Sequence, residues 1–471
     1  MRLSLRGNVL LMTPWCPALS KSLSYRRRIR VQEPGRPMRH RYVPTNLFDV
    51  QEGVGLTHAG MLPRVIRELT IRGMPYEIED LRQALPEPEY SRLQPLREMQ
   101  DQVLAAIVSS HGGIIKAPTA FGKSFIICQL CRIYPQLRIL IVSRSQQVVG
   151  QLFKRICAAA EDRKVSVCDG AHTFKPESEV VICTARSMHK IPAEWPHLLL
   201  FDEVHGAGSE DAVVELARFS STRRFGFSAS PQGRSDNADR HVEALFGKQI
   251  VDIPYAMAED LDLVAGIDVN FVDVDCEIDE KRNEVAKKRW GYWRNQYRNR
   301  LIAQATEDFD PTWQRLILVE TVEHALALRQ LLPEYAVVHA GISEEDWTRF
   351  VNWGLVLPEQ RLKLKSVDTA ELRNQFQNGA LLRAIVTPTW KEGVDFTYLR
   401  ILTRADGAPG QIPSVQIPGR LSRTGVKDDG ILIDFYDNFG GWYLNRSQER
   451  ERVYRKHGWK VTRWVPGKIS R

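Results

Sequence analysis

Two series of short apolar runs constrain the fold of this chain of 471 residues. The first series reads GGIIKA, RILIVS, EVVICT and HLLLFDE, and the second reads QRLILVE, YAVVHAG, RAIVTP, LRILTRA and GILIDFYD. Such runs are typical of buried parallel strands, which are apolar on both faces and end in small or polar residues. Helical stretches such as TVEHALALRQLL separate them. Strands that alternate with helices predict an α/β fold with two parallel sheets in succession.

Interruptions of this pattern divide the chain into domains. The segment QALPEPEYSRLQP, residues 83–95, contains three prolines and interrupts regular structure. The segment AMAEDLDLVAGIDV, residues 256–269, lies between the two series and is the expected hinge. We therefore expect an N-terminal α+β accessory domain over residues 1–88, α/β domains over 89–258 and 259–458, and a basic tail over 459–471.

Composition narrows the class of protein. The net charge of +8 favours an anionic partner, above all nucleic acid. Seven cysteines, an odd number, do not form a disulfide framework and favour a reducing compartment. Cys128 and Cys131 form a CxxC without a second pair, so we expect a buried helix face there. No apolar run approaches the roughly 20 residues of a membrane span, and the first residues lack a convincing cleavage site. The sequence predicts a cytoplasmic protein.

The first strand of the first series leads into a loop that suits a nucleotide phosphate. APTAFGKS, residues 117–124, precedes the apolar helical pattern SFIICQLCRIY. In such loops, backbone N–H groups and the helix N-terminus hold phosphates, a lysine adds a mobile charge, and a hydroxyl binds Mg²⁺. Lys123 and Ser124 supply the last two groups, and Gly122 lets the backbone approach the nucleotide. The general pattern GxxxxGK[ST] fails at its first glycine, where Ala117 stands.

A second candidate half-site ends the strand HLLLFDE. Asp202 and Glu203 are adjacent carboxylates that leave an apolar strand, which is unfavourable unless they meet a cation. Asp202 can hold Mg²⁺ through water, and Glu203 can orient and deprotonate an attacking water. Together with the upstream loop, this strand end predicts a site that binds a nucleotide phosphate and Mg²⁺ and activates a water.

These motifs stand in an order that resembles the superfamily 2 DEAD/DEAH-like DNA helicases, in particular their XPB/UvsW-like group. LREMQDQVL resembles the segment before motif I, and APTAFGKS stands as motif I, which in this superfamily often begins with Ala and Pro. RILIVSRSQQVVGQ, VVICTARSM, DEVH and GFSASPQGRSD resemble motifs Ia, Ib, II and III. Two departures are that Arg144-Ser145 replaces the more usual Pro-Thr, and that Ser228-Ala229-Ser230 stands where Thr-Ala-Thr is common.

The second series continues the resemblance. YAVVHAG is similar to the strand of the second motor domain that carries HxG, and TPTWKEGVDF resembles motif V with Thr387 at its start. QIPGRLSR matches QxxGRxxR, which is motif VI. Arg420 and Arg423, three residues apart, can share one helical face. The resemblance implies that they reach an ATP held by the other domain and stabilise charge on its γ-phosphate.

The resemblance implies two tandem RecA-like motor domains, with ATP and Mg²⁺ as cofactors. It also implies roles for single residues. The implied catalytic residues are Glu203, Gln416, Arg420 and Arg423. The implied nucleotide contacts are Arg97, Gln100, Thr119, Ala120, Phe121, Gly122, Lys123, Ser124, Gly393 and Asp395, with Ser124 and Asp202 on the metal. His205, Ser228 and Ser230 are implied to couple nucleotide state to movement. Nucleic-acid contacts are implied at Arg144, Thr184, Ser187, Arg234 and Thr387.

Two further segments carry open alternatives. LSKSLSYRRRIRVQ is strongly basic, and the N-terminal layout is weakly similar to the accessory domain of UvsW-like phage helicases. It is either a module that recognises duplex or branched nucleic acid or a solvated basic face. EVAKKRWGYWRNQYRNRLIAQATEDF is expected to be one helix. Its aromatic residues Trp290, Tyr292, Trp293 and Tyr297 stack bases in one interpretation and pack against the protein in the favoured one.

The expected function is ATP hydrolysis coupled to movement on, or remodelling of, duplex or branched DNA. Closure of two domains around ATP would ratchet strands past each other. Three alternatives stay open: an RNA helicase, a motor subunit of a restriction or defence assembly, and a nucleotide-gated binding protein with little turnover. Gln416 in motif VI and the DEVH quartet weigh against the DEAD-box RNA group. The expected partner is DNA, and no membrane is expected.

Overall fold

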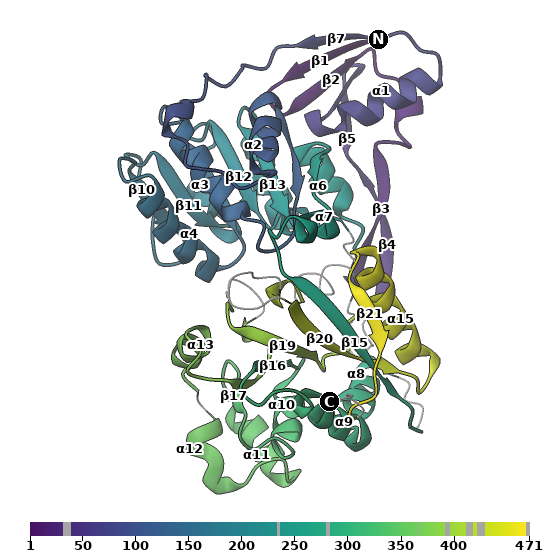
Figure 1. The fold of residues 1–471 in the computed structure, drawn as a ribbon. Helices are drawn as coiled ribbons and strands as arrows, with labels where there is room; N and C mark the ends of the chain where they lie inside the picture. Colours follow the sequence, from purple (N-terminus) through teal and green to yellow (C-terminus); the bar gives the residue numbers. More distant parts are fainter. Residues whose placement is uncertain are drawn as a thin grey trace. The chain divides into compact units, whose positions relative to one another are not determined.

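The structure is a computed structural model that describes residues 1–31, 39–232, 236–278, 283–365, 367–390, 396–410, 418–421 and 429–467. The chain forms two compact units (Figure 1), Met1–Pro118 with Gly122–Ile253 and Pro254–Arg471 with Thr119–Phe121. Each unit contains a seven-stranded parallel sheet, and the first unit also carries a smaller N-terminal sheet. The predicted α/β fold with two successive parallel sheets is therefore confirmed.

The N-terminal part is a five-stranded mixed sheet with one helix packed on it, in the order β5-β6-β2-β1-β7. In the central strand β2, buried Leu10 and Met12 alternate with more exposed neighbours, because only one face of this sheet is covered. Helix α1 supplies the cover by burying Val65 and Leu69. The elements are β1 (Arg2–Arg6), β2 (Val9–Thr13), β5 (Phe48–Gln51), β6 (Val54–His58), α1 (Leu62–Ile71) and β7 (Glu77–Asp80). A separate ribbon consists of β3 (Ser24–Val31) and β4 (Arg39–Asn46).

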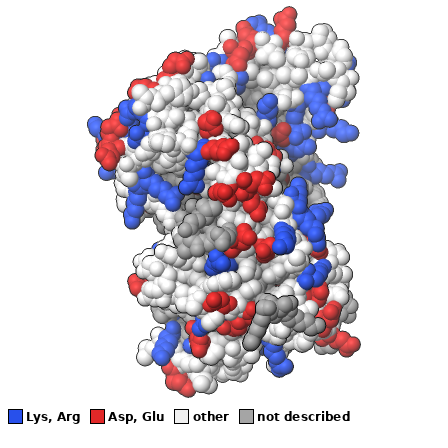
Figure 2. Space-filling view, in the orientation of Figure 1, with Lys and Arg blue, Asp and Glu red and all other residues white. Residues whose placement is uncertain are grey.

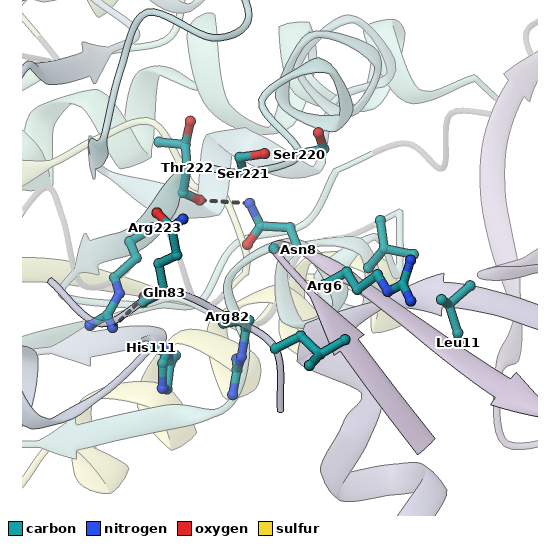
Figure 3. A pocket seen from close by; sticks show the side chains of 13 residues that line it. Arg6, Asn8, Leu11, Arg82, Gln83, His111, Ser220, Ser221, Thr222 and Arg223 are labelled. Atoms are coloured by element: carbon teal, nitrogen blue, oxygen red, sulfur yellow. Dashed lines mark hydrogen bonds between the residues drawn. The ribbon is translucent and has the colours of Figure 1, made fainter. Parts of the chain in front are cut away.

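Specific contacts join this small sheet to the rest of the first unit. The Asn8 side chain donates hydrogen bonds to the carbonyls of Phe219 (3.0 Å) and Thr222 (2.6 Å). Arg64 forms a bidentate ion pair with Glu243, at 2.8 and 2.6 Å. A cavity of about 620 Å³ lies along the seam, and Figure 3 shows Asn8 and residues after Phe219 on its walls. The two parts of this unit are thus held together by several independent contacts.

The first parallel sheet has the order β10-β11-β9-β12-β13-β8-β14. Its strands β9, β11 and β12 are buried along their whole length, as their continuous apolar runs predict. Cys128 and Cys131 are buried on α3, which confirms their predicted place in a helix face. The strands are β8 (Gly112–Lys116), β9 (Ile139–Ser143), β10 (Val165–Cys168), β11 (Val180–Thr184), β12 (Leu198–Asp202), β13 (Arg223–Ser228) and β14 (Gln249–Asp252). The helices are α2 (Gln100–Ser109), α3 (Lys123–Ile133), α4 (Gln146–Ala159), α5 (Glu210–Arg218) and α6 (Asp239–Phe246).

The second parallel sheet has the order β17-β18-β16-β19-β20-β15-β21. The segment expected as a basic tail contributes β21, which pairs in parallel with β15. The strands are β15 (Gly266–Val274), β16 (Gln314–Leu318), β17 (Ala336–Val338), β18 (Arg383–Val386), β19 (Leu399–Arg404), β20 (Asp429–Asp437) and β21 (Lys460–Arg463). The helices are α7 (Tyr255–Asp260), α8 (Glu284–Lys288), α9 (Gln296–Glu307), α10 (Val322–Arg329), α11 (Glu344–Asn352), α12 (Arg361–Leu364), α13 (Thr369–Gln377) and α15 (Gly441–Lys456).

The aromatic segment that was expected to be one helix is broken. Helices α8 and α9 are separated by a single π-helical turn, Arg289–Trp293, and Asn295 begins α9 by accepting a hydrogen bond from the Arg298 N–H. Tyr292 and Trp293 are buried in the core of the second unit, as core packing predicts. The other two aromatic residues, Trp290 in the turn and Tyr297 in α9, are exposed.

Candidate active site

The candidate site residues of the first unit gather where three neighbouring strands end. Strands β12, β13 and β8 are adjacent and parallel, so their carboxyl ends share one edge of the sheet. Asp202 ends β12, Ser228 ends β13, and the loop 117–122 follows β8. This edge is where ligands bind in open parallel α/β sheets. The sheet therefore brings the predicted motifs I, II and III to one place.

The loop after β8 has the backbone of a phosphate-binding turn. Ala120 and Gly122 have φ angles of +72° and +105°, and Gly122 directly precedes α3. Lys123 Nζ donates hydrogen bonds to the carbonyls of Ala117 (3.1 Å) and Pro118 (2.9 Å), so its charge lies over the loop. Ser124 is the second residue of α3. The lysine, the hydroxyl and the helix N-terminus thus have the arrangement that binding a phosphate requires.

Gln100 lies directly against this loop. Its side chain is 1% exposed, and its Oε1 accepts a hydrogen bond from the Arg97 N–H at 3.0 Å. A Cβ on Gly122 would lie 2.5 Å from Gln100 Nε2, so a glycine is required at this close approach. The Arg97 side chain is exposed. Of the remaining loop residues, Phe121 is buried, whereas Thr119 and Ala120 are half-buried.

The two carboxylates after β12 have opposite pKa shifts. Burial, together with the neighbouring charge of Glu203, raises the pKa of Asp202 to about 7. Burial alone would also raise the pKa of Glu203, but hydrogen bonds from His205 and Ser228 and the charge of Lys123 lower it to about 2. Glu203 is therefore the carboxylate that stays ionised, and it also has a φ angle of +56°, which turns the chain sharply after the strand.

Glu203, His205 and Ser228 form one polar cluster. His205 Nδ1 lies 3.3 Å from Glu203 Oε2 and 3.3 Å from Ser228 Oγ. The Ser228 hydroxyl donates to Glu203 Oε2 at 3.2 Å and accepts from the Ser230 N–H at 3.1 Å. His205, Ser228 and Ser230 are all buried. The expected coupling residues of motifs II and III are therefore in direct contact through hydrogen bonds.

The site fits a divalent cation. Asp202 is 7% exposed, and within the described ranges no side chain donates a hydrogen bond to its carboxylate or pairs with it. A buried carboxylate in this state is unfavourable, and a hard cation with oxygen ligands would relieve it. Ser124, on the adjacent loop, offers the hydroxyl ligand that such loops provide.

The expected nucleic-acid contacts are spread over several strand ends. Arg144 is exposed, and its side chain packs against Gly206. A Cβ added to Gly206 would lie 2.2 Å from Arg144 Cδ. Thr184 Oγ1 donates to Ser187 Oγ at 3.0 Å, and both side chains are buried. In the second unit, the Thr387 hydroxyl donates to the Val338 carbonyl at 3.1 Å. Among these four residues, Arg144 is the one with an exposed cationic side chain.

Several expected site residues lie outside the described residues. These are Arg234, Gly393, Asp395, Gln416 and Arg423, together with the side chain of Arg420. Asp236, two residues after Arg234, is described, and its carboxylate accepts a hydrogen bond from the Ala238 N–H at 3.2 Å.

Sequence reasoning missed Gly226, in the middle of β13. A Cβ at this position would lie 2.3 Å from Val204, the residue after Glu203. The glycine therefore lets the turn that carries Glu203 and His205 pack directly on the neighbouring strand. A glycine inside an otherwise apolar strand pattern is the signal that could have indicated this close approach.

Comparisons with known proteins agree with this geometry. A family model described as "Type III restriction enzyme, res subunit" matches residues 93–233. The curated protein "DNA 3'-5' translocase XPB2" of Sulfurisphaera tokodaii is 22% identical over 399 residues, which cover 79% of this chain and 88% of that protein. The chain is thus similar to helicases of superfamily 2. These similarities support ATP hydrolysis as its activity.

Solved structures show the same fold. The structure of Dbp5 of S. cerevisiae bound to RNA and ADP BeF3 matches with a TM-score of 0.55 and 13% identity, over 80% of this chain and 92% of that one. A fragment of an HsdR subunit of a type I restriction enzyme from Vibrio vulnificus YJ016 matches with a TM-score of 0.52 and 16% identity, over 72% and 63%. Across the described part of the chain, no helix is long and apolar enough to span a bilayer.

Proposed function

We propose that this chain is an ATP-dependent DNA translocase that moves on, or remodels, duplex or branched DNA. The observation that carries the proposal is the cluster of Lys123, Asp202, Glu203 and His205 at one edge of the first sheet. The XPB2 relative, named as a DNA translocase, supports DNA over RNA as the track. The net charge of +8 suits either nucleic acid.

In this proposal, residues 89–258 and 259–458 are the two motor domains. Lys123 and the N–H groups of its loop bind the β- and γ-phosphates, and Gln100 with Arg97 contacts the adenine. Asp202 and Ser124 hold Mg²⁺, which when bound neutralises charge on the phosphates. Glu203, kept ionised by His205 and Ser228, accepts a hydrogen bond from the attacking water and orients it.

The remaining roles are proposed for the second motor domain. Gln416, Arg420 and Arg423 contact the γ-phosphate and stabilise its developing charge, and Gly393 and Asp395 of motif V complete the nucleotide contacts. Arg144, Thr184, Ser187, Arg234 and Thr387 are proposed to contact the nucleic-acid backbone, which carries no sequence information. All seven cysteines are free, which supports a reducing compartment such as the cytoplasm.

The decisive experiment measures ATP hydrolysis with single-stranded DNA, duplex DNA, a four-way junction and RNA. We expect duplex or branched DNA to stimulate hydrolysis more than RNA does. Lys123→Ala and Glu203→Gln should each lower hydrolysis about 10²–10⁴-fold. Wild-type hydrolysis rates in both variants would contradict the assigned site, and selective stimulation by RNA would contradict the DNA track.

A second candidate function is a motor subunit in a restriction or defence assembly. The match to the restriction-subunit family over residues 93–233 favours it. In this case movement would serve a nuclease on a partner. Purified alone, such a subunit should hydrolyse ATP on DNA without cleaving it, and cleavage should appear only when the partner is added.

A further inference from the structure

The ribbon of β3 and β4 is the most basic segment of the N-terminal part. The two strands pair over their whole length, from Ser24 opposite Asn46 to Val31 opposite Arg39, and they stand apart from the five-stranded sheet (Figure 1). Residues 21–46 contain eight Lys or Arg residues and one acidic residue, Glu33. In the space-filling view, Lys and Arg atoms gather along the upper right edge, at the height of β3 (Figure 2). The ribbon is therefore a concentrated cationic element.

The register divides the ribbon into two faces. Residues directly opposite each other on paired strands share a face, and successive residues alternate. One face, here called the outer face, carries Arg26 opposite Pro44 and Arg28 opposite Tyr42. The other, the inner face, carries Tyr25 opposite Thr45, Arg27 opposite Val43 and Ile29 opposite Arg41.

The inner face is fastened to the first parallel-sheet region. Tyr25 Oη lies 2.6 Å from His241 Nδ1. Arg27, whose side chain is only 12% exposed, donates to the Gly208 carbonyl at 3.2 Å and pairs with Glu210 at 3.2 Å. These contacts fix the side of the ribbon that faces the protein.

The backbone of β3 makes a second attachment. The Arg28 N–H donates to the Asp236 carbonyl at 3.1 Å, and Asn237 Nδ2 donates to the Arg26 carbonyl at 3.2 Å. Arg27 Nη2 also lies 3.8 Å from the Asp236 carboxylate. The ribbon is thus held by the segment 236–237 as well as by Gly208.

Both attachment points continue motifs of the candidate active site. Gly208 ends the short 3₁₀ helix Val204–Gly208, which begins directly after Glu203. Asp236 follows β13 and its Ser228 along the chain. His205, in this 3₁₀ helix, also contacts Ser228, the last residue of β13. The ribbon is therefore tied to both segments that surround the catalytic carboxylate.

The outer face is open to solvent at Arg26 and Tyr42, and Arg28, opposite Tyr42, is half-buried. Arg26 is exposed and Tyr42 is 56% exposed. Within the described ranges, no ion pair or side-chain hydrogen bond involves the guanidinium groups of Arg26 and Arg28. These two arginines are i and i+2 on one strand, so they lie about 7 Å apart in a row. A row of unpaired cations beside an exposed tyrosine is complementary to a polyanion backbone.

We propose that the outer face of the ribbon grips the phosphate backbone of duplex DNA, and that Arg27 couples this grip to ATP hydrolysis. This inference rests on the proposed DNA translocase function. A two-stranded ribbon is narrow enough to enter a major groove of about 12 Å. Arg26 and Arg28 contact phosphates, and Tyr42 packs beside them. Arg27 is a positioning residue, because it touches the segments next to Glu203 and Ser228 rather than the substrate.

The grip is tested by duplex DNA binding without nucleotide, measured across a range of salt concentrations. Log K falls as log salt concentration rises. In the Arg26→Ala/Arg28→Ala variant this fall should be less steep by about 2 in slope, because two phosphate contacts are lost. The matched control is Arg67→Ala/Arg72→Ala, which removes two exposed cations, one in α1 and one directly after it, and should leave the slope unchanged. An unchanged slope in the ribbon variant would overturn the grip. So would an equal loss in the control variant.

The same experiment tests two other possible ligands of the outer face. An acidic peptide and vesicles with anionic headgroups are tested for binding to the wild-type chain. If the ribbon variant loses affinity for either and keeps its affinity for DNA, the surface belongs to that partner and the proposal is wrong. Because binding is measured without ATP, this outcome is distinct from failure of the translocase proposal, in which no nucleic acid stimulates wild-type hydrolysis.

The coupling is tested at saturating duplex DNA. Arg27→Met keeps the aliphatic stem but removes the contacts with Gly208, Glu210 and Asp236. DNA-stimulated kcat should fall at least about fivefold, while the DNA concentration for half-maximal stimulation stays unchanged. Arg27→Lys should restore part of the stimulation. Full stimulation in Arg27→Met would overturn the coupling, and a matching melting temperature shows that the variant is folded.

Discussion

His205 Nδ1 lies 3.3 Å from Glu203 Oε2, so a buried imidazole holds the carboxylate that is proposed to orient water. His205 is 4% exposed, and the same nitrogen also reaches Ser228. The histidine therefore fixes the position of Glu203 relative to the end of the neighbouring strand. Its effect on hydrolysis should be indirect, because it acts through Glu203.

His205→Ala should lower DNA-stimulated ATP hydrolysis about 10–100-fold, the size of effect expected when the partner that orients an active-site group is removed. Nucleotide binding should be retained, because Lys123 and its loop are untouched. Steady-state hydrolysis and binding of a fluorescent nucleotide check the two parts. His205→Gln keeps a hydrogen-bonding side chain and should lose less activity. Equal loss of binding and hydrolysis would contradict this role.

Gly122→Ala should impair the phosphate loop by steric contact. The residue has a φ angle of +105°, and the new Cβ would lie 2.5 Å from Gln100 Nε2. We expect a loss of about 1–3 kcal/mol in the free energy of unfolding, from backbone strain, and weaker ATP binding. Urea denaturation and nucleotide titration measure these effects.

Ala120→Gly is the informative control for this loop. Ala120 already has a φ angle of +72°, so a glycine there relieves strain and should leave stability within about 1 kcal/mol of the wild type. Equal destabilisation by Gly122→Ala and Ala120→Gly would contradict the positive φ angles of these two residues.

His58 should make stability depend on pH. Burial, with the nearby charges of Arg224 and His241, lowers its pKa from 6.5 to about 4. As pH falls from 6.5 towards 4, the unfolded chain therefore binds a proton that the folded chain does not. Folding loses stability over that window and gains nothing from this group above it. The loss should reach about 1–2 kcal/mol at pH 5, since the side chain remains partly exposed.

Urea denaturation of the wild type and of His58→Gln, at pH 7.5, 6 and 5, measures this linkage. As pH falls, the wild type should lose stability relative to the His58→Gln variant. A difference that is constant across these pH values would show that His58 titrates normally in the fold.

The parallel sheets were predictable because strands such as LLLFD are apolar on both faces, and a strand of this kind has few alternatives to a buried parallel sheet. The adjacency of Asp202, Ser228 and the loop 117–122 was less accessible. It depends on strand order, which the local pattern does not carry.

Other features could not be predicted for physical reasons. The π-helical turn at Arg289–Trp293 occurs where Tyr292 and Trp293 pack into the hydrophobic core of the second unit. This tertiary packing overrides the local helical pattern. In the run of three arginines, only strand register distinguishes buried Arg27 from Arg26 and Arg28, which line the opposite face. Register is set by pairing with residues of β4 farther along the chain, such as Val43 opposite Arg27.

Arg298→Met should strongly destabilise the second unit. Arg298 Nε donates to Asp437 Oδ1 at 2.7 Å, and both side chains are fully buried. Among the described residues, removing the guanidinium leaves the Asp437 carboxylate with Arg450, at 3.7 Å, as its one remaining ion-pair partner. Breaking one partner out of a buried pair costs about 3–5 kcal/mol, which calorimetry should record as a lower melting temperature. Arg300→Met, on the exposed side of the same helix, should change stability by less than about 0.5 kcal/mol. Similar melting temperatures for the two variants would mean that the buried pair contributes no more than a surface arginine.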